Sequence, residues 1–184
     1  MRDNLTNKTL REAEASSIQH FIENNVGLLV GDVLDYGCGK QPYRDIIVAA
    51  GGVYHGYDRP GYAGSTVKVK VGEDWPLGRK RFWGAILCNQ VIQYLSDPRQ
   101  ILCSFYDALG PGGWLVMTGP TNWPEVEPVD TWRFTTEGIG RLVDVTGFHQ
   151  VTAVSREQMR INDIVLSLGW GVVGQRPPVK KAKR

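Results

Sequence analysis

The stretch VLDYGCGKQPY, residues 33–43, predicts the end of a buried strand, a glycine turn and the start of a helix. The apolar residues Val33 and Leu34 lead to Asp35, and Gly37 and Gly39 then break the strand. Pro42 suits the first helical position, because its ring fixes φ and the amide hydrogen that it lacks would be unpaired there. The first turn between a strand and a helix in a doubly wound sheet is where ligands bind, so we expect a ligand on this turn.

A second acidic residue supports this expectation. Asp58 closes the next predicted strand, 19 residues after Gly39, which is about the spacing at which an acid holds the hydroxyls of a ribose. A dinucleotide site favours a third glycine where Pro42 stands, and Asp35 would repel a pyrophosphate but accept a hydrogen bond from an ammonium group. The residues therefore favour a nucleoside joined to a zwitterionic amino acid. The plainer alternative is that the glycines only permit a tight turn and that Asp58 is a turn residue.

Strands and helices are predicted to alternate along the chain. The apolar spacing predicts an opening helix over residues 8–25. Further helices are predicted at 42–50, at 97–109 with Asp97 as N-cap and Pro98 first, and from Thr135 or Thr136 to about residue 146. Strands are predicted at 32–36, 53–58, 66–71, 84–89, 114–118, 148–154 and 164–173.

This order indicates an α/β fold, with a doubly wound, mostly parallel seven-stranded sheet and helices on both faces. Only SREQMRIND, residues 155–163, separates the last two strands. A parallel crossover needs a dozen or more residues, so the last strand should run antiparallel.

Composition indicates one globular domain. The chain has 184 residues, of which 42% are hydrophobic and 22% charged. We expect a single domain over residues 1–174 and a disordered basic tail over 175–184, which holds five basic residues and no acidic one. Without that tail the net charge of +2 becomes −3, a poor electrostatic match for nucleic acid, which we do not expect as a partner.

Two other features limit the location and the cofactors. No apolar run is long enough to span a membrane, and the N-terminus lacks the apolar core of a signal peptide, so we expect a cytoplasmic protein without a membrane partner. The three cysteines and three histidines show no metal-ligand spacing, so we expect free thiols and no bound metal.

Four motifs resemble, in order, those of class I S-adenosylmethionine-dependent methyltransferases. They are VLDYGCGKQPY (33–43), YHGYD (54–58), AILCNQVIQYLSDP (85–98) and LGPGGWLVMTGP (109–120). Residues 130–148, DTWRFTTEGIGRLVDVTGF, resemble a segment of the small-molecule branch of that family. The resemblance covers about residues 30–174 and implies a Rossmann-like methyltransferase domain that uses S-adenosylmethionine. The family's sheet also carries one late antiparallel strand.

The resemblance also implies the cofactor contacts. It places Asp35, Gly37, Cys38 and Gly39 around the methionine part, Asp58 on the ribose, Arg59 beside the adenine, and Asn89, Gln90 and Val91 near the sulfur. Two positions depart from the family pattern. Gln41 stands where the third glycine of the turn is usual, and Val71 stands where an acid often meets the adenine amino group. Glu73 or Asp74, or a backbone group, could take the part of that acid.

The acceptor side is less defined by sequence. Residues 119–134 follow the fifth strand at the ligand edge and form a long link, and long links often carry function. Trp123 and Trp132 could wall a pocket, and Asn122, Asp130 and Arg133 could orient an acceptor. Alternatively, Trp132 packs on the core while Asp130 and Arg133 pair with each other. The opening helix either covers the cofactor or serves only the core.

Methyl transfer from a sulfonium mainly requires a close acceptor and the exclusion of water, so no dedicated catalytic residue is obligatory. A base matters if the acceptor is a hydroxyl or a protonated amine, and the candidates are Asp130, Tyr94 and His55. Tyr94 stands where many relatives carry a histidine. His55 falls within a strand, where a hydrogen-bonded core imidazole is the alternative.

We therefore expect an S-adenosylmethionine-dependent methyltransferase that methylates oxygen or nitrogen of a small-molecule or glycan acceptor. One alternative is a non-catalytic protein of the same fold that serves as a binding or regulatory subunit, because Gln41 and Val71 depart from the pattern. A nicotinamide-dependent oxidoreductase is disfavoured by Pro42 and by the antiparallel last strand. The sequence does not predict an oligomeric state.

Overall fold

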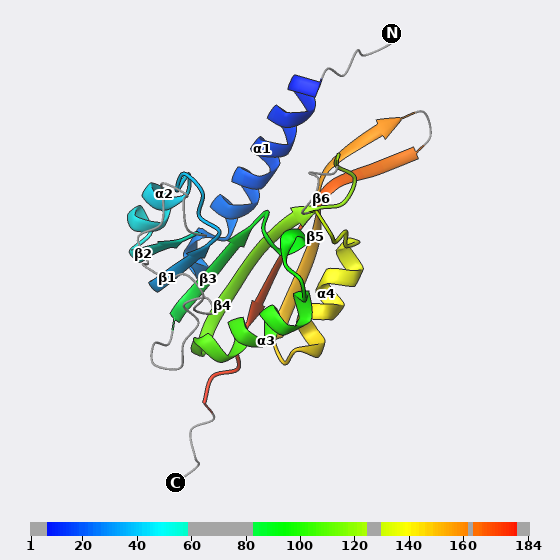
Figure 1. Ribbon diagram of the computed structural model, residues 1–184. Helices are drawn as coiled ribbons and strands as arrows, with labels where there is room; N and C mark the ends of the chain where they lie inside the picture. The colour runs from blue at the N-terminus through cyan, green and yellow to red at the C-terminus, as the bar shows by residue number, and fades with distance from the viewer. Residues whose placement is uncertain (1–6, 59–82, 125–129, 162–163, 180–184) are drawn as a thin grey trace.

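The computed structural model describes residues 7–58, 83–124, 130–161 and 164–179. Within these ranges one six-stranded sheet has the order β2-β1-β3-β4-β6-β5 (Figure 1). The strands are β1 (Gly31–Tyr36), β2 (Gly52–Tyr57), β3 (Trp83–Asn89), β4 (Leu109–Pro120), β5 (His149–Ile161) and β6 (Ile164–Gln175). The helices are α1 (Asn7–Asn24), α2 (Arg44–Ala49), α3 (Pro98–Ala108) and α4 (Thr136–Val145), with short 3₁₀ turns η1 (Val26–Leu28) and η2 (Ile92–Tyr94).

The sheet is mixed, with a parallel part and an antiparallel part. β1 pairs in parallel with β2 and β3, and β3 pairs in parallel with β4. β6 runs antiparallel to both of its neighbours, β4 and β5. The mostly parallel sheet and its antiparallel last strand are therefore confirmed. The strand predicted at 66–71, the seventh of the expected sheet, lies outside the described residues.

The hairpin of β5 and β6 is longer than predicted. Pairing continues to Ile161 opposite Ile164, through most of the link that was expected to be a loop. β4 ends earlier, with Pro120 opposite Gly169. The end of the hairpin therefore projects past the rest of the sheet, as Figure 1 shows at the upper right. Apolar periodicity did not predict this extension, because it is formed by pairing between the two strands.

Two apolar clusters lie against the sheet. Leu34 packs in one cluster with Phe105 of α3, whereas Val33 packs in the other with Ile22 of α1 and Ile47 of α2. Neighbouring residues of a strand point to opposite faces. The described helices are therefore divided between the two faces, with α3 and α4 on one side and α1 and α2 on the other.

Two predicted helix caps are present. The Asp97 carboxylate accepts hydrogen bonds from the backbone N–H groups of Arg99 and Gln100, both at 3.0 Å, and Pro98 is the first residue of α3. The Thr135 hydroxyl accepts a hydrogen bond from the Gly138 N–H at 3.0 Å at the start of α4. Each side chain supplies an acceptor to an N–H group that has no partner inside its helix.

The predicted start of the second helix was wrong. α2 begins at Arg44, with Tyr43 as its N-cap, so Pro42 is not the first helical residue. The reason is Gln41, whose φ of 60° directs the chain through a further turn, closed by a 3.2 Å hydrogen bond from the Arg44 N–H to the Gln41 carbonyl. The helix can start only after that turn.

The C-terminal end of β6 joins the part of the chain predicted as a tail. β6 ends at Gln175, and the Arg176 guanidinium lies 5.0 Å from the centre of the Tyr106 ring and donates to the Asp107 carbonyl at 3.1 Å. Residues 180–184 lie outside the described ranges, so the tail itself stays a prediction. None of the helices in the described ranges combines the length and the apolar character that a membrane crossing requires.

Candidate cofactor and acceptor site

Several predicted cofactor residues lie at the carboxyl ends of parallel strands. Asp35 lies near the end of β1, Asp58 directly follows β2, and Asn89 ends β3. Because these strands are parallel and adjacent, their carboxyl ends meet at one edge of the sheet. The turn after β1 is fastened to β2, since the N–H groups of Gly37 and Cys38 both donate to the Tyr57 carbonyl, at 2.8 and 2.9 Å.

Both glycines of the turn have a left-handed backbone, with φ of 82° at Gly37 and 51° at Gly39. A Cβ at Gly37 would lie 2.2 Å from a methyl group of Val91, so this position must be glycine for the turn to pack there. A Cβ at Gly39 would meet nothing within 4 Å. The surface above Gly39 is therefore open, and next to it the Gly39 N–H donates to the Asp58 carboxylate at 2.8 Å.

The carboxyl group of Asp35 is buried, with 1% of the residue exposed. It accepts a 2.6 Å hydrogen bond from the Tyr54 hydroxyl. Its pKa is raised to about 7, mainly by burial and to a lesser extent by the nearby charge of Asp58, while the Tyr54 hydrogen bond acts in the opposite direction. A carboxyl group in this state can ionise when a cation binds beside it.

Cys38 lies next to these two acids, and burial, followed by the charges of Asp35 and Asp58, raises the pKa of its thiol to about 12. It is therefore a neutral packing residue. None of the described cysteines forms a disulfide, and Cys88 is also buried whereas Cys103 is exposed. The described ranges contain no group of three or more residues suited to hold a metal ion.

A chain of hydrogen bonds crosses the ends of β3 and β4. The Asn89 amide donates to the Tyr43 hydroxyl at 3.2 Å, and its carbonyl oxygen accepts a hydrogen bond from the Thr118 hydroxyl. Gln90, which follows β3, has a left-handed φ of 57°, and its N–H donates to the Thr118 carbonyl at 3.0 Å. A residue other than glycine in this conformation is typical of functional sites, where surrounding contacts hold the strain.

Sequence reasoning missed a buried ion pair beside Gln90. Glu14 of α1 and Arg156 of β5 are 7% and 4% exposed, and their side chains are 2.8 Å apart. The Arg156 guanidinium also donates to the Ser17 hydroxyl and to the Trp170 carbonyl. The same Glu14 oxygen lies 3.5 Å from the Gln90 amide nitrogen. A separation of 142 residues left no local signal for this pair.

On the acceptor side, Asp130 and Arg133 form a bidentate ion pair with each other. Arg133 also donates to the Trp123 carbonyl at 3.4 Å, so these three residues fasten the segment to itself. The Asn122 amide donates to the Ser167 carbonyl at 2.8 Å and attaches the segment to β6. Trp132 is 38% exposed, and its indole N–H donates to the Leu95 carbonyl at 2.9 Å.

The other candidate bases lie in different places. The His55 imidazole donates a 2.7 Å hydrogen bond to the Asp32 carboxylate and lies edge-on to Trp83. Asp32 and Trp83 belong to the first residues of β1 and β3, away from the carboxyl ends. Tyr94 lies in η2 with 38% exposure. Of the predicted adenine-side residues, Arg59, Glu73 and Asp74 lie outside the described ranges.

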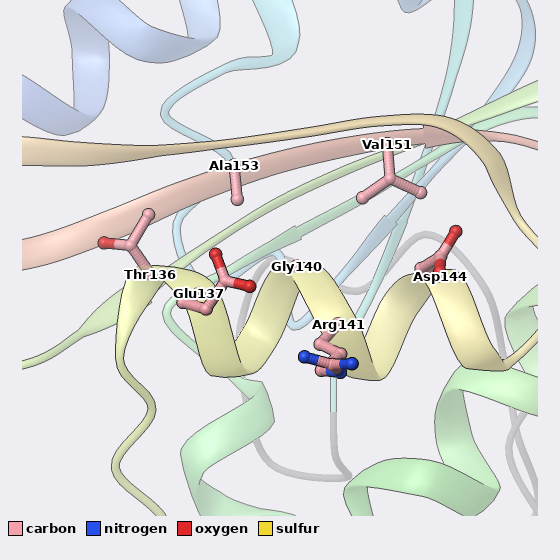
Figure 2. A pocket seen from close by; sticks show the side chains of 7 residues that line it. All are labelled: Thr136, Glu137, Gly140, Arg141, Asp144, Val151 and Ala153. Carbon is pink, nitrogen blue, oxygen red and sulfur yellow. The ribbon is translucent and has the colours of Figure 1, made fainter.

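The described residues also line hollows elsewhere on the surface. One, lined by Trp132 and Phe134 together with the first residues of α3, contains one predicted acceptor residue. Another lies between α4 and β5, and Figure 2 shows Glu137, Arg141 and Asp144 along it. This second hollow contains none of the predicted site residues.

The geometry fits an adenosyl amino acid. A carboxylate beside an open turn can accept hydrogen bonds from two ribose hydroxyls, and a buried carboxyl group with a raised pKa can accept one from an ammonium group. The sequence profile of the family described as "Methyltransferase domain" matches residues 8–152. The chain belongs to this methyltransferase family. A methyltransferase domain therefore spans most of the chain.

Solved structures share the fold of this methyltransferase. A SAM-dependent methyltransferase from Archaeoglobus fulgidus is 12% identical, with a TM-score of 0.64 over 90% of this chain and 94% of that chain. An O-methyltransferase family protein from Burkholderia thailandensis is 14% identical, with a TM-score of 0.64 over 95% of this chain and 59% of that chain.

A third structure, described as a DhpI–SAH complex, is 14% identical, with a TM-score of 0.62 over 95% of this chain and 89% of that chain. At these identities the structures establish the fold alone. No curated protein matches the sequence.

Proposed function

We propose that this methyltransferase acts on oxygen or nitrogen of a small-molecule or glycan acceptor, in the small-molecule branch of the family. The observation that carries the proposal is the meeting of Asp35, the glycine turn, Asp58 and the Asn89–Gln90 pair at one edge of the sheet. Residues 130–148, whose sequence resembles that branch, lie against η2 through hydrogen bonds from the Thr131 and Trp132 N–H groups to the Gln93 carbonyl.

The cofactor roles follow the position of each residue. Asp58 holds the ribose hydroxyls, and Asp35 accepts a hydrogen bond from the ammonium group. Gly37, Cys38 and Gly39 contact the methionine part, and Asn89, Gln90 and Val91 lie near the sulfur. The assignment of Asp58 to the ribose is supported by the open surface above Gly39 and by the hydrogen bond from the Gly39 N–H to the Asp58 carboxylate. We also propose that the adenine is contacted by Arg59 and by either Glu73 or Asp74.

The acceptor roles are supported unequally. Trp132 lines a hollow and is partly exposed, which supports contact with an acceptor. Asp130 and Arg133 bind each other, so we propose that they shape the segment that contains Asn122 and Trp123. The protein's own work is to hold the acceptor in line with the sulfonium and to keep water out. The seventh strand at 66–71 and the cytoplasmic location remain parts of this proposal.

Calorimetry with S-adenosylmethionine, S-adenosylhomocysteine and NAD tests the proposal. We expect the two adenosyl compounds to bind and NAD not to bind. Asp58→Ala should weaken both by about 1.5–3 kcal/mol, or roughly 10- to 150-fold, because hydrogen bonds to a charged carboxylate are lost. Asp144→Ala, an exposed acid of α4, is the control and should bind like the wild type. Unchanged affinity in Asp58→Ala would refute the ribose assignment.

A further inference from the structure

Two buried side-chain oxygens beside Gln90 have no hydrogen-bond donor among the residues that the structure describes. They are Oε2 of Glu14 and Oε1 of Gln93. Glu14 is 7% exposed and Gln93 is 2% exposed. Leaving such an atom unpaired costs about 1–3 kcal/mol, and more for a charged group. Two such atoms next to the same residue point to a ligand that supplies the missing hydrogens.

Gln93 approaches Gln90 from η2. Its amide nitrogen donates to the Gln90 carbonyl at 3.0 Å, which identifies the other terminal atom as the oxygen. Its backbone carbonyl accepts two hydrogen bonds, from the N–H groups of Thr131 at 2.9 Å and Trp132 at 3.1 Å. Gln93 therefore links the residue after β3, through its side chain, to the predicted acceptor segment, through its backbone.

Glu14 approaches Gln90 from α1. Its Oε1 atom is used by the Arg156 guanidinium at 2.8 Å and by the Gln90 amide at 3.5 Å, which leaves Oε2 without a donor in the described ranges. Arg156 balances the charge of the carboxylate, so the pair is neutral as a unit. A neutral site that offers acceptor oxygens favours hydroxyl or amine hydrogens and disfavours an anion, whose oxygens would face oxygens.

We propose that Glu14 and Gln93 form the acceptor-binding subsite of this methyltransferase and accept hydrogen bonds from O–H or N–H groups of the molecule that is methylated. This inference rests on the proposed function, because it places the methyl acceptor beside Gln90. It narrows the acceptor to one that presents hydrogen-bond donors next to the reacting atom. It also gives α1 a role in the site, since Glu14 is its contribution.

The test uses fragments that differ in their donors. Benzyl alcohol and benzylamine carry donors, toluene carries none, and benzoate is an anion that only accepts. Binding to the protein saturated with S-adenosylhomocysteine is measured by ligand-observed NMR up to about 10 mM. We expect the two donor fragments to bind and toluene and benzoate to bind at least about fivefold more weakly. Equal binding of all four, or no binding of the donor fragments, would overturn the inference.

Two variants assign the binding to the two oxygens. Glu14→Gln and Gln93→Met should each weaken the binding of benzyl alcohol roughly fivefold or more. The affinity of each variant for S-adenosylhomocysteine should stay within about threefold of the wild-type value. Ser17→Ala is the control, because Ser17 also accepts a hydrogen bond from Arg156 but is not part of the proposed subsite. Thermal unfolding verifies that each variant is folded, and if Glu14→Gln is not, Gln93→Met decides alone.

The remaining outcomes are also decisive. If Glu14→Gln weakens the binding of S-adenosylhomocysteine by about tenfold, the Glu14 carboxylate binds the ammonium group of the cofactor. The inference then fails while the proposed function stands. If the wild type does not bind S-adenosylhomocysteine, the proposed function fails first. The two failures are therefore distinguished by one calorimetric measurement on the wild type.

Discussion

Asp35 is a single residue whose charge responds to pH within the neutral range. Its pKa is raised to about 7, so it is mostly neutral at pH 6 and mostly ionised at pH 8. An ammonium group binds the ionised form better. The affinity for S-adenosylhomocysteine should therefore rise with pH up to about 7, by as much as about tenfold per unit, and then level off. Calorimetry at about pH 6, 7 and 8 measures this.

Asp35→Asn is the control for that pH dependence, since its affinity should be lower and nearly independent of pH in this range. The folded apoprotein gives a second measurement. The pKa is higher in the folded state, about 7 against 3.8, so the stability that the neutral carboxyl contributes is present below pH 3.8 and lost as pH rises toward 7. Equal pH dependence of unfolding in the wild type and in Asp35→Asn would contradict the assignment.

The backbone conformation at Gln41 favours glycine over glutamine. Its φ of 60° lies in the left-handed region, where a residue with a Cβ costs about 1–2 kcal/mol. Glycine removes that cost but loses more entropy on folding, so Gln41→Gly should raise the free energy of unfolding by up to about 1 kcal/mol. Urea unfolding measures it. Gln19→Gly, inside α1, should instead lower the free energy of unfolding by about 1 kcal/mol. A lower free energy of unfolding in both variants would count against the strain argument.

At the scale of elements, the contact between β4 and β6 leaves no room for an added methyl group. A Cβ at Gly119 would lie 2.2 Å from the fully buried ring of Trp170. Gly119→Ala should therefore lower the free energy of unfolding by about 1–3 kcal/mol, since either the ring or the strand must move. Gly27→Ala is the matched control, because a Cβ there would meet nothing within 4 Å. Equal urea midpoints for the two variants would show that the strands adjust without cost.

The elements also show how far sequence patterns could reach. Asp97 and Thr135 were identified as caps because a cap depends only on residues two or three positions away. β4 was predicted at 114–118 but starts at Leu109, because its first residues are ordered by pairing with Trp83 rather than by their own composition. Residues 110–113 of that stretch are three glycines and a proline, which by composition favour a turn over a strand.

The candidate site likewise contains residues that local sequence predicts and contacts between distant residues that it does not predict. The turn and Asp58 were predicted because they lie on one short segment of strand, turn, helix and strand. The contact between Glu14 and Arg156 was not predicted, because nothing in the sequence says that a glutamate of the first helix reaches an arginine 142 residues later. Long-range polar contacts of this kind require the assembled sheet, whereas local turns do not.

At the scale of the whole molecule, β6 lies between β4 and β5 and joins them. A chain that stops after residue 163 should therefore lose its cooperative thermal transition, because β5 has no other strand to pair with in the described sheet. A chain that stops after residue 179 should unfold within a few degrees of the full length, to judge from the circular dichroism at 222 nm. A cooperative transition in the shorter chain would mean that the parallel part folds independently.

The inserted position of β6 also orders events during synthesis. β4 emerges from the ribosome long before residues 164–175, and Trp114 must wait for Gln175, its partner in the ladder. During that interval one side of β4 exposes free backbone groups that can pair with another nascent chain. Slow translation of the last fifty residues should therefore promote aggregation of this protein more than slow translation of the first fifty.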